Sequence, residues 1–542
     1  MPSSPIDDLR TVVQAAAAEL RNGSAAERLA LERPKKAGFG DYSTNAAMLL
    51  APGLGEPPRA IAERLGAAIG ERLGARVERV EVAGPGFLNL FLADAWHTDA
   101  VDAVLAAGDA YGAGDPLRGE RIQVEFVSAN PTGPLTAASG RHAAFGDALA
   151  RLLGFAGHAV QREYYFNDGG GQIERLGLSI QARARGERPP EDGYQGEYVT
   201  ALAAAIPDAA EKTADELAAA GIERLMADIR ATLTDYRVEF DRWFLEATLY
   251  AGAPSAWDRA RAQLDAEGRT YTADGALWLR TTALGDDKDR VLERSSGEPT
   301  YFAADVAYHW DKLDRGFDRL INVLGADHHG YVARLKAAVA AVGADPDRLE
   351  VPILQFVHVV EGGARASMSK RRGDFVTLAE LIEEIGVDAT RWFMLSRSAD
   401  STVDLDLTLA RAQSSENPVY YVQYAHARIV SVLRRAGPER VAAALAAPRD
   451  GLILDPAERE LVKKLLAFPA EAADAAARRA PHRIATYALE TAQAFTAFYR
   501  DCRVVGAEPA ELESFRLALS VAAQRVIARA LDLLGVAAPQ TM

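Results

Sequence analysis

The feature that most constrains the fold is a change in the hydrophobic pattern near Asp406. From Arg121 to Asp406, short apolar runs typical of buried strands alternate with helical patterns, which indicates a parallel sheet with crossover helices. After Asp406 the strand signals stop, and helical stretches follow at 415–436, 456–475, 483–504 and 509–535. The sequence therefore predicts a Rossmann-like α/β domain with insertions, followed by an all-α bundle. The bundle has its own apolar faces, so we expect the rest to stay folded when it is removed from about Ser414.

Residues 1 to about 112 predict a further, small α/β domain. Helices are expected from Ile6 to Leu20 and from Pro58 to Leu73, and strands at Val77–Val82 and Phe87–Leu92. The Gly, Pro and Asp residues of 112–118 indicate a linker. A chain of 542 residues is too long for one ordinary domain. We expect three, with boundaries at 1–112, 113–406 and 407–542.

Composition limits the class of protein. Hydrophobic residues make up 49% and charged residues 25%, as in soluble globular proteins. The apolar runs are all shorter than the roughly 20 residues of a membrane span, so no membrane partner is expected. Met1 to Arg10 is polar and does not resemble a signal peptide, and the single cysteine, Cys502, excludes an internal disulfide. These features predict a cytoplasmic protein, and we expect no bound metal.

A strand, a loop and a helix between Arg121 and Leu153 form one candidate site. Ile122–Val127 is typical of a buried strand, 128–135 is a Pro/Gly loop, and Thr136 or Ser139 can cap the helix that follows. Free N–H groups and the helix dipole at such a helix start attract anions, and nucleotides bind there in open α/β sheets. Because this unit is common in α/β folds, it is weak support for a site by itself.

The segment 366–373, Ala-Ser-Met-Ser-Lys-Arg-Arg-Gly, forms a second candidate site. A Ser/Gly loop with Lys370 and Arg371 can fold over a triphosphate, since lysine supplies a point charge and arginine a bidentate fork. A solvated basic turn is the alternative. The net charge of −15 weighs against a nucleic-acid partner, although a large acidic protein can still carry a basic groove.

Six segments, in order, resemble the arginyl-tRNA synthetases, a class I family. Residues 368–371, Met-Ser-Lys-Arg, resemble the loop usually written Lys-Met-Ser-Lys-Ser, and 128–135, Ser-Ala-Asn-Pro-Thr-Gly-Pro-Leu, resembles the run into the His-x-Gly-His signature. The others are Phe39–Asn45 and Ala83–Phe87, similar to the N-terminal tRNA-binding domain, Gly325–Tyr331, similar to an active-site strand end, and Asn417–Arg428, similar to the first helix of the anticodon-binding bundle. The resemblance spans nearly the whole chain.

The resemblance implies a two-step reaction. L-Arginine and Mg-ATP give arginyl-adenylate and pyrophosphate, and the 3′ end of tRNA-Arg then accepts the arginyl group. The implied partners are tRNA-Arg, L-arginine and ATP, with ATP and Mg²⁺ as substrate and no tightly bound cofactor. A monomer is expected.

The resemblance also implies roles for individual residues. For arginine they are Glu125, Ser128 and Asn130 at the amino-acid head, and Tyr301, Asp305 and Asp327 around the side chain. For ATP they are Pro131, Gly140, His328, Gly330, Met368, Ser369 and Lys370, with Lys370 and Arg371 as the catalytic cations for the β- and γ-phosphates. For tRNA they are Phe39, Tyr42, Asn45, Tyr420, Gln423 and Arg428. The arginine side chain requires an acidic pocket, because its guanidinium presents five hydrogen-bond donors in a fixed fork. Asp305 lies in an apolar run of the sequence, where an unpaired charge would be costly, which favours a cationic partner for it.

Two departures from the family pattern stand out. Ser367 replaces the first lysine of the phosphate loop, and Thr136-Ala137-Ala138-Ser139 replaces His-x-Gly-His, so that both histidines are absent. Thr136 and Ser139 hydroxyls, or His142 one turn further on, are the candidate catalytic substitutes. The alternative is a non-catalytic tRNA-binding paralogue. A ligase that makes another aminoacyl-adenylate has no positive feature in its favour.

Overall fold

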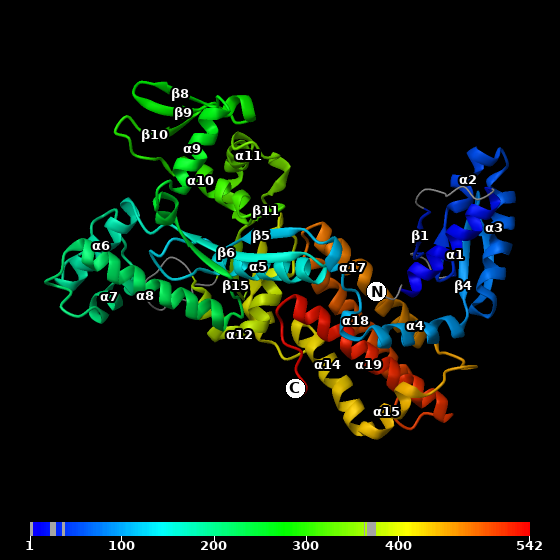
Figure 1. The fold of residues 1–542 in the computed structure, drawn as a ribbon. Helices are drawn as coiled ribbons and strands as arrows, with labels where there is room; N and C mark the ends of the chain where they lie inside the picture. The colour runs from blue at the N-terminus through cyan, green and yellow to red at the C-terminus, as the bar shows by residue number, and fades with distance from the viewer. Residues whose placement is uncertain (1–3, 22–28, 35–37, 363, 366–375) are drawn as a thin grey trace.

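The computed structural model of the chain describes all residues except 1–3, 22–28, 35–37, 363 and 366–375. The predicted phosphate loop, with Met368, Ser369, Lys370 and Arg371, therefore lies outside the described residues. The N-terminal part, the α/β part and the C-terminal helices follow one another along the chain (Figure 1). Within the described residues, no helix combines the length and the apolar character needed to cross a membrane.

The N-terminal part is an antiparallel sheet covered by helices. The strand order is β1 (Leu31–Glu32), β2 (Tyr42–Thr44), β4 (Phe87–Leu92) and β3 (Val77–Ala83), and the helices are α1 (Pro5–Leu20), α2 (Ala46–Leu54), α3 (Pro58–Leu73) and α4 (Asp94–Ala107). Pro58 starts α3 and Gly74 ends it, as the sequence predicts. The helices α2 and α4 were not predicted. A short 3₁₀ turn, η1 (Gly74–Arg76), joins α3 to β3, and two more, η2 (Gly108–Ala110) and η3 (Pro116–Arg118), lie between α4 and the next sheet.

A five-stranded parallel sheet forms the centre of the middle part. Its order is β13 (Leu349–Glu350), β11 (Arg319–Asn322), β5 (Arg121–Glu125), β6 (Ala159–Phe166) and β7 (Arg242–Leu245). The chain runs from β5 to β6 and β7 on one side, and then to β11 and β13 on the other. The order therefore reverses between β5 and β11, and the carboxyl ends of these two strands are where ligands bind in open α/β sheets.

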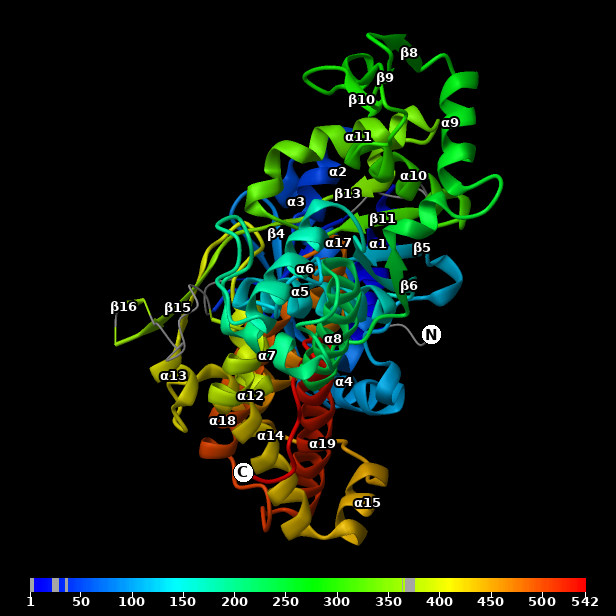
Figure 2. The ribbon, with the colours of Figure 1, turned by 90° about the vertical axis from the view of Figure 1, so that its left-hand side faces the viewer.

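The crossovers carry two insertions. Helix α5 (Ala137–Phe155) joins β5 to β6, and α6 (Gly171–Ala184), α7 (Glu197–Ala205) and α8 (Ala214–Asp235) lie between β6 and β7. Between β7 and β11 come η4 (Glu246–Tyr250), α9 (Ala256–Ala266), the antiparallel strands β8 (Thr270–Ala273), β9 (Ala276–Leu279) and β10 (Arg290–Glu293) with η5 (Thr281–Leu284), and α10 (Tyr301–Asp314). Both views place β8–β10 at the opposite end of the molecule from the C-terminal helices (Figures 1 and 2).

Short elements connect this sheet to the C-terminal bundle. They are β12 (Leu324–Gly325), η6 (Ala326–Tyr331), α11 (Val332–Ala341), η7 (Pro346–Arg348), β14 (Ile353–Leu354), β15 (Val357–Glu361), β16 (Ala364–Arg365), α12 (Leu378–Leu395), β17 (Val403–Asp406) and α13 (Leu407–Arg411). The last strand ends at Asp406, as predicted. The bundle consists of α14 (Pro418–Ala436), α15 (Pro438–Ala446), α16 (Pro456–Leu466), α17 (Phe468–Ala477), α18 (His482–Asp501) and α19 (Ala510–Leu533).

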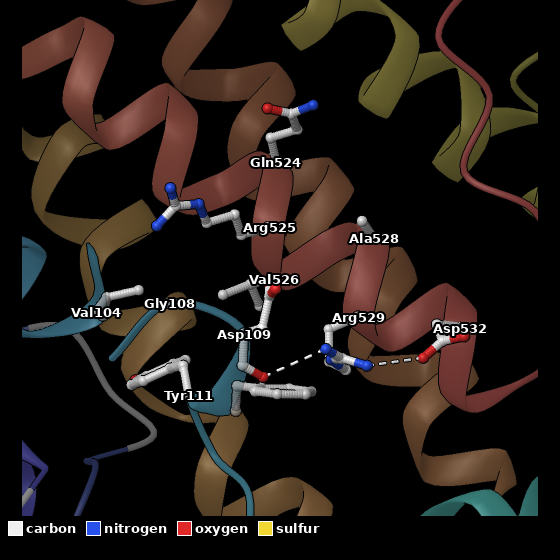
Figure 3. A pocket seen from close by; sticks show the side chains of 11 residues that line it. Val104, Gly108, Asp109, Tyr111, Gln524, Arg525, Val526, Ala528, Arg529 and Asp532 are labelled. Atoms are coloured by element: carbon white, nitrogen blue, oxygen red, sulfur yellow. Dashed lines mark hydrogen bonds and ion pairs between the residues drawn. The ribbon is translucent and has the colours of Figure 1, made fainter. Parts of the chain in front are cut away.

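Ion pairs join the N-terminal part to the bundle. Acidic groups of the former meet cations of α16 and the loop before it, in the pairs Asp41–Lys463 (3.0 Å), Asp94–Arg459 (2.6 Å) and Asp102–Arg449 (2.5 Å). Beside them, a cavity of about 320 Å³ lies between η2 and α19 (Figure 3). Arg529 closes one side of it by donating to the Asp109 carbonyl (3.3 Å) and to Asp532 (2.8 Å). The cavity lies apart from the carboxyl ends of β5 and β11.

Candidate active site

A strained turn follows β5 and positions the first acidic group of the site. Val127 and Ser128 have φ angles of 67° and 42°, a left-handed conformation that a β-branched residue rarely adopts. Two hydrogen bonds hold the turn, because the Ser128 hydroxyl donates to Glu125 Oε1 (3.0 Å) and accepts from the Tyr165 N–H (3.2 Å). Strain of this kind is typical of functional sites. It places the buried Glu125 carboxylate at the point where the strand order reverses.

The predicted residue Asn130 lies beyond this turn. Its amide donates to Gln172 Oε1 of α6 (2.9 Å), and its oxygen accepts from the Asn167 N–H after β6 (3.4 Å). The loop after β5 is thereby joined to the start of the first insertion. Glu125, Ser128 and Asn130 thus come together at the same edge of the sheet.

Asp305 lies near the start of α10 and accepts a hydrogen bond from the Tyr331 hydroxyl. Burial raises the pKa of Asp305 to about 7, and the neighbouring carboxylates Glu125 and Glu246 push it in the same direction. Tyr331 and, more weakly, Arg334 oppose this shift. A half-buried carboxyl group with a raised pKa is stabilised in its ionised form by a cationic partner, and a guanidinium can be that partner.

Glu246 is a second acid in this pocket that the sequence analysis missed. The Tyr165 hydroxyl donates to Glu246 Oε2 (2.5 Å), and burial raises the pKa of Glu246. Glu246 directly follows β7 and so lies at the carboxyl edge of the same sheet as Glu125. That position after a strand was the signal in the sequence that could have found it.

A cavity of about 640 Å³ opens beside these acids. Glu246, Tyr250 and Tyr301 line it, together with the Gly169–Gly171 segment at the start of α6. Tyr301 is 65% exposed, so its ring lies at the mouth and not inside the acidic pocket. The role predicted for Tyr301 beside the arginine side chain stays a prediction, since its ring lines the cavity that opens beside these acids.

Asp327 lies apart from this acidic pocket. Its side chain is 71% exposed, and its carboxylate lies 3.4 Å from His328 Nε2. A Cβ added at Gly325 would lie 2.7 Å from Asp327 Oδ1 and 3.6 Å from the His142 ring, so these two side chains meet on the same side of β12. The structure thus groups Asp327 with His142 and His328, and its role toward the arginine side chain stays a prediction.

His142 faces this second group from α5. Burial, followed by the nearby Arg141 cation, lowers the pKa of His142 to about 4. At neutral pH its imidazole is therefore uncharged and carries one N–H donor. His142 and His328 lie at the carboxyl edge of the sheet, on the side of the α5 N-terminus.

The N-terminus of α5 is closed by the chain itself. Thr136 is the N-cap residue, and it forms a capping box with Ser139. The Ala137 N–H donates to the Val376 carbonyl (2.9 Å), and the Leu378 N–H donates to the Leu135 carbonyl (2.8 Å). The segment 376–378, which directly follows residues 366–375 in the chain, is therefore bound to the turn that replaces the family signature.

The remaining residues predicted to bind ATP differ in their surroundings. Gly140 is buried, and a Cβ added there would lie 2.7 Å from Leu378 Cδ1, so close packing of α5 on α12 explains the glycine. Pro131 is also buried. Gly330 is exposed in η6, two residues after His328. Direct nucleotide contact therefore fits Gly330 better than Gly140.

The residues predicted to bind tRNA fall into two surfaces. In the N-terminal part, exposed Phe39 and Phe87 line a cavity of about 330 Å³, whereas Tyr42 is 4% exposed and packs on Trp96. Asn45 precedes α2 and makes no side-chain cap there. Tyr42 therefore packs beneath this surface, and its contact with tRNA stays a prediction.

On α14, the rings of Tyr420 and Tyr424 stack at 6.1 Å, and the Arg428 guanidinium lies 4.7 Å from the Tyr424 ring. Gln423 is 8% exposed, and its amide donates to Asp388 Oδ2 and to the Ala537 carbonyl (both 2.9 Å). The role of Gln423 toward tRNA stays a prediction, and its two amide N–H groups are bound within the protein.

Comparison with known proteins decides the family. Residues 7–92 match the family described as arginyl tRNA synthetase N terminal domain, 252–413 match the tRNA synthetases class I (R) catalytic domain, and 422–542 match the DALR anticodon binding domain. The chain is 45% identical over 98% of its length to the arginine–tRNA ligase of Shouchella clausii, of which 97% is covered. The chain belongs to the arginyl-tRNA synthetase family.

A further relative and a solved structure support the same family for this arginyl-tRNA synthetase. The arginine–tRNA ligase of Frankia alni is 47% identical, with 94% of each chain covered. Among solved structures, the arginyl-tRNA synthetase of Thermus thermophilus is 25% identical with a TM-score of 0.76, covering 99% of this chain and 100% of that one. The predicted fold class is confirmed: an N-terminal domain, a class I catalytic domain and a helical C-terminal domain.

Proposed function

We propose that this synthetase activates L-arginine with Mg-ATP and transfers it to tRNA-Arg at the site formed by the carboxyl ends of β5, β7 and β11. Arginine–tRNA ligase activity follows from the family. The observation that carries the assignment of this site is the half-buried acidic pair of Asp305 and Glu246 beside the buried Glu125 carboxylate. An acidic pocket of this kind suits a substrate with a cation at each end.

The two ends of arginine fit different groups of the pocket. The guanidinium pairs with Asp305, with Glu246 as the second acceptor, and its planar fork satisfies carboxylates in bidentate fashion. The α-ammonium binds the Glu125 carboxylate, near Ser128 and Asn130. The substrate carboxylate then points toward the α5 side of the sheet, where His142 and His328 lie.

The first chemical step joins the arginine carboxylate to the α-phosphate of ATP. A new oxygen–phosphorus bond forms, the bond to the bridging oxygen breaks, and pyrophosphate leaves with Mg²⁺. The protein positions the reactants and places donors where charge develops. We assign Lys370 and Arg371 to the β- and γ-phosphates, and the neutral N–H of His142 to the reacting end of the nucleotide.

The second step transfers the arginyl group to a ribose hydroxyl at the 3′ end of the tRNA, releasing AMP. The match of residues 422–542 to an anticodon binding domain supports binding of the anticodon arm by the bundle. The exposed Phe39 and Phe87 offer aromatic faces on which a nucleic-acid base can stack. We propose that Tyr420 and Arg428 contribute to the bundle surface in the same way.

Arginine-dependent charging of tRNA by the purified chain tests this proposal. We expect charging with arginine and none with lysine, whose ammonium cannot fill two carboxylate acceptors in bidentate fashion. The non-catalytic paralogue finds no support among the relatives described above, which bear the names of active ligases. A protein that binds tRNA but neither charges it nor exchanges pyrophosphate would restore that alternative.

A further inference from the structure

A turn that contains two prolines, Pro131 and Pro134, joins the loop after β5 to the N-terminus of α5. Proline has no backbone N–H, so this turn has few donors with which to hold its own shape. The Tyr198 hydroxyl, on α7 of the first insertion, donates to the Thr132 carbonyl between the two prolines (2.7 Å). The first insertion therefore anchors the turn from outside.

The ring of Tyr198 is held by the apolar core of the insertion. Helices α6, α7 and α8 pack together (Figure 1), and their buried side chains, among them Leu176, Val199 and Leu217, form a cluster separate from the main core. Tyr198 packs against this cluster, and burial raises the pKa of its hydroxyl. The hydroxyl is therefore protonated at neutral pH and acts as a donor whose position the insertion sets.

Two glycines leave room for this ring. A Cβ added at Gly196, just before α7, would lie 2.7 Å from two ring carbons of Tyr198. A Cβ added at Gly133 would lie 3.3 Å from the Tyr198 hydroxyl oxygen. Neither glycine has a positive φ, so a left-handed backbone is not the reason for glycine at either position. The ring occupies the space that the two glycines leave between the insertion and the turn.

We infer that Tyr198 is a positioning residue for the nucleotide: its hydroxyl holds the turn of residues 131–134 in the shape that receives ATP at the N-terminus of α5. The inference rests on the proposed function, which places the reacting end of the nucleotide on the α5 side of the sheet. Tyr198 does not touch the substrate and acts through the Thr132 carbonyl. The first insertion is thereby part of the nucleotide site, although it lies outside the catalytic sheet.

The two ends of the turn have anchors that do not depend on Tyr198. Before the turn, Asn130 is held by side-chain bonds to α6 and to the backbone after β6. After it, the Leu378 N–H donates to the Leu135 carbonyl (2.8 Å). Loss of the Tyr198 hydroxyl should therefore free only residues 131–134. ATP must then order this segment as it binds, and the cost is the same in the bound state and in the transition state.

The variant Tyr198→Phe removes the hydroxyl and keeps the ring. Pyrophosphate exchange is measured with saturating arginine and tRNA while the ATP concentration is varied. We expect the KM for ATP to rise by about threefold to tenfold, the scale of one neutral hydrogen bond, and kcat to change by less than about twofold. The affinity for arginine, measured by calorimetry, should also change by less than about twofold, because Asn130 keeps its own anchors.

Tyr194→Phe is the matched control. Tyr194 packs against the same apolar cluster, and it holds the Ser179 hydroxyl through its backbone N–H (2.9 Å), which the substitution keeps. This variant should have the KM and kcat of the wild type.

Gly133→Ala tests the same contact from the side of the turn. The added Cβ displaces the Tyr198 hydroxyl, so this variant should also raise the KM for ATP. Combined with Tyr198→Phe, it should raise the KM no further than the larger of the two single effects, because the hydroxyl contact is already lost. Fully additive effects would show that the two residues act independently and would overturn the inference. If Tyr198→Phe does not fold, an unchanged KM in Gly133→Ala overturns it.

The remaining outcomes separate the inference from the proposed function. A wild type without arginine-dependent exchange overturns the proposed function, and the inference with it. With an active wild type, an unchanged KM for ATP in Tyr198→Phe overturns the inference alone. A lower kcat at unchanged KM does the same, because that is the result of losing folded protein and nothing else. Equal weakening of ATP and arginine also contradicts a role confined to the nucleotide.

Discussion

The hydroxyl oxygens of Thr136 and Ser139 lie 3.2 Å apart and close the N-terminus of α5. Thr136 Oγ1 accepts from the Ser139 N–H (3.3 Å), and Ser139 Oγ accepts from the Thr136 N–H (3.4 Å). Because one hydroxyl also donates to the other, a single O–H proton remains for a phosphate. The pair that stands in place of two signature histidines can therefore supply at most one side-chain donor, and it also has to cap the helix.

His142 is accordingly the better candidate for the missing donor. Its imidazole is neutral because its pKa, lowered by burial, is about 4, and it faces the group of Asp327 and His328. We expect His142→Ala to slow pyrophosphate exchange about 100-fold with tRNA present, the usual effect of losing one preorganised donor. His158→Ala, which removes the histidine just beyond the other end of α5, is the control and should leave the rate unchanged. Equal rates in the wild type and His142→Ala would remove His142 from the reaction.

Thr136→Ala should act mainly on stability. Loss of an N-cap side chain costs about 1 kcal/mol of unfolding free energy, and Ser139 would lose its partner in the capping box. Chemical denaturation measures this change, and the exchange rate of the folded variant should fall less than that of His142→Ala. A rate loss that exceeds the His142→Ala effect would instead assign the phosphate donor to Thr136.

The periodicity of the sequence predicted the helices and strands well, whereas the sequence predicted the residues of the site less well. The predicted bounds of α3 and β4 agree with the structure because Pro58, Gly74 and Gly86 mark their ends in the sequence. Glu246 was missed because its pocket forms only when an insertion brings the end of β7 beside α10. Tyr42 and Gln423 were assigned to surfaces because motif matches carry no information about burial, which depends on neighbours distant in sequence.

Lys370→Ala should slow adenylate formation by roughly 100-fold or more and leave arginine binding unchanged, since the proposed contact is to phosphate. Single-turnover kinetics with saturating ATP measure the first quantity, and calorimetry with arginine measures the second. Lys336→Ala, which removes an exposed lysine of α11 paired with Asp347, serves as a control. An unaffected rate would show that Lys370 is not the cation for the triphosphate.

Removal of the bundle from Ser414 should unfold the rest of the chain, contrary to the expectation from sequence. Arg391 of α12 is fully buried, and its guanidinium donates to the carbonyls of Leu534 (2.9 Å) and Tyr236 (3.0 Å) and pairs with Asp147 (2.5 Å). One apolar core also runs through all three parts of the chain. Truncation would expose that core and a buried charge. Circular dichroism and size-exclusion chromatography measure the outcome, and a folded monodisperse fragment would contradict it.

Arginine binding should depend on pH through Asp305. Burial foremost, with help from Glu125 and Glu246, raises the pKa of this carboxyl to about 7, against the opposing influence of Tyr331 and Arg334. The guanidinium pairs with the ionised form, so below pH 7 arginine must displace a proton. The affinity should fall by up to about tenfold per pH unit below 7 and level off above it. The stability of the free protein should change in the opposite direction. The unfolded chain loses the Asp305 proton at a lower pH than the folded protein does, so the contribution of Asp305 to the free energy of unfolding is lost as the pH rises toward 7.

Calorimetry in two buffers of different ionisation enthalpy measures how many protons are released when arginine binds. At pH 6, arginine binding should release close to one proton, whereas at pH 8 it should release almost none. Asp305→Asn should remove the pH dependence and weaken binding by about 2–5 kcal/mol, because the guanidinium would lose a buried charged acceptor. The same variant should be more stable than the wild type above pH 7 in the absence of ligand, since it carries no carboxyl to ionise. If the wild type binds arginine equally well at pH 6 and pH 8 without proton release, the titrating group does not contact the guanidinium, and Glu246 becomes the principal acceptor.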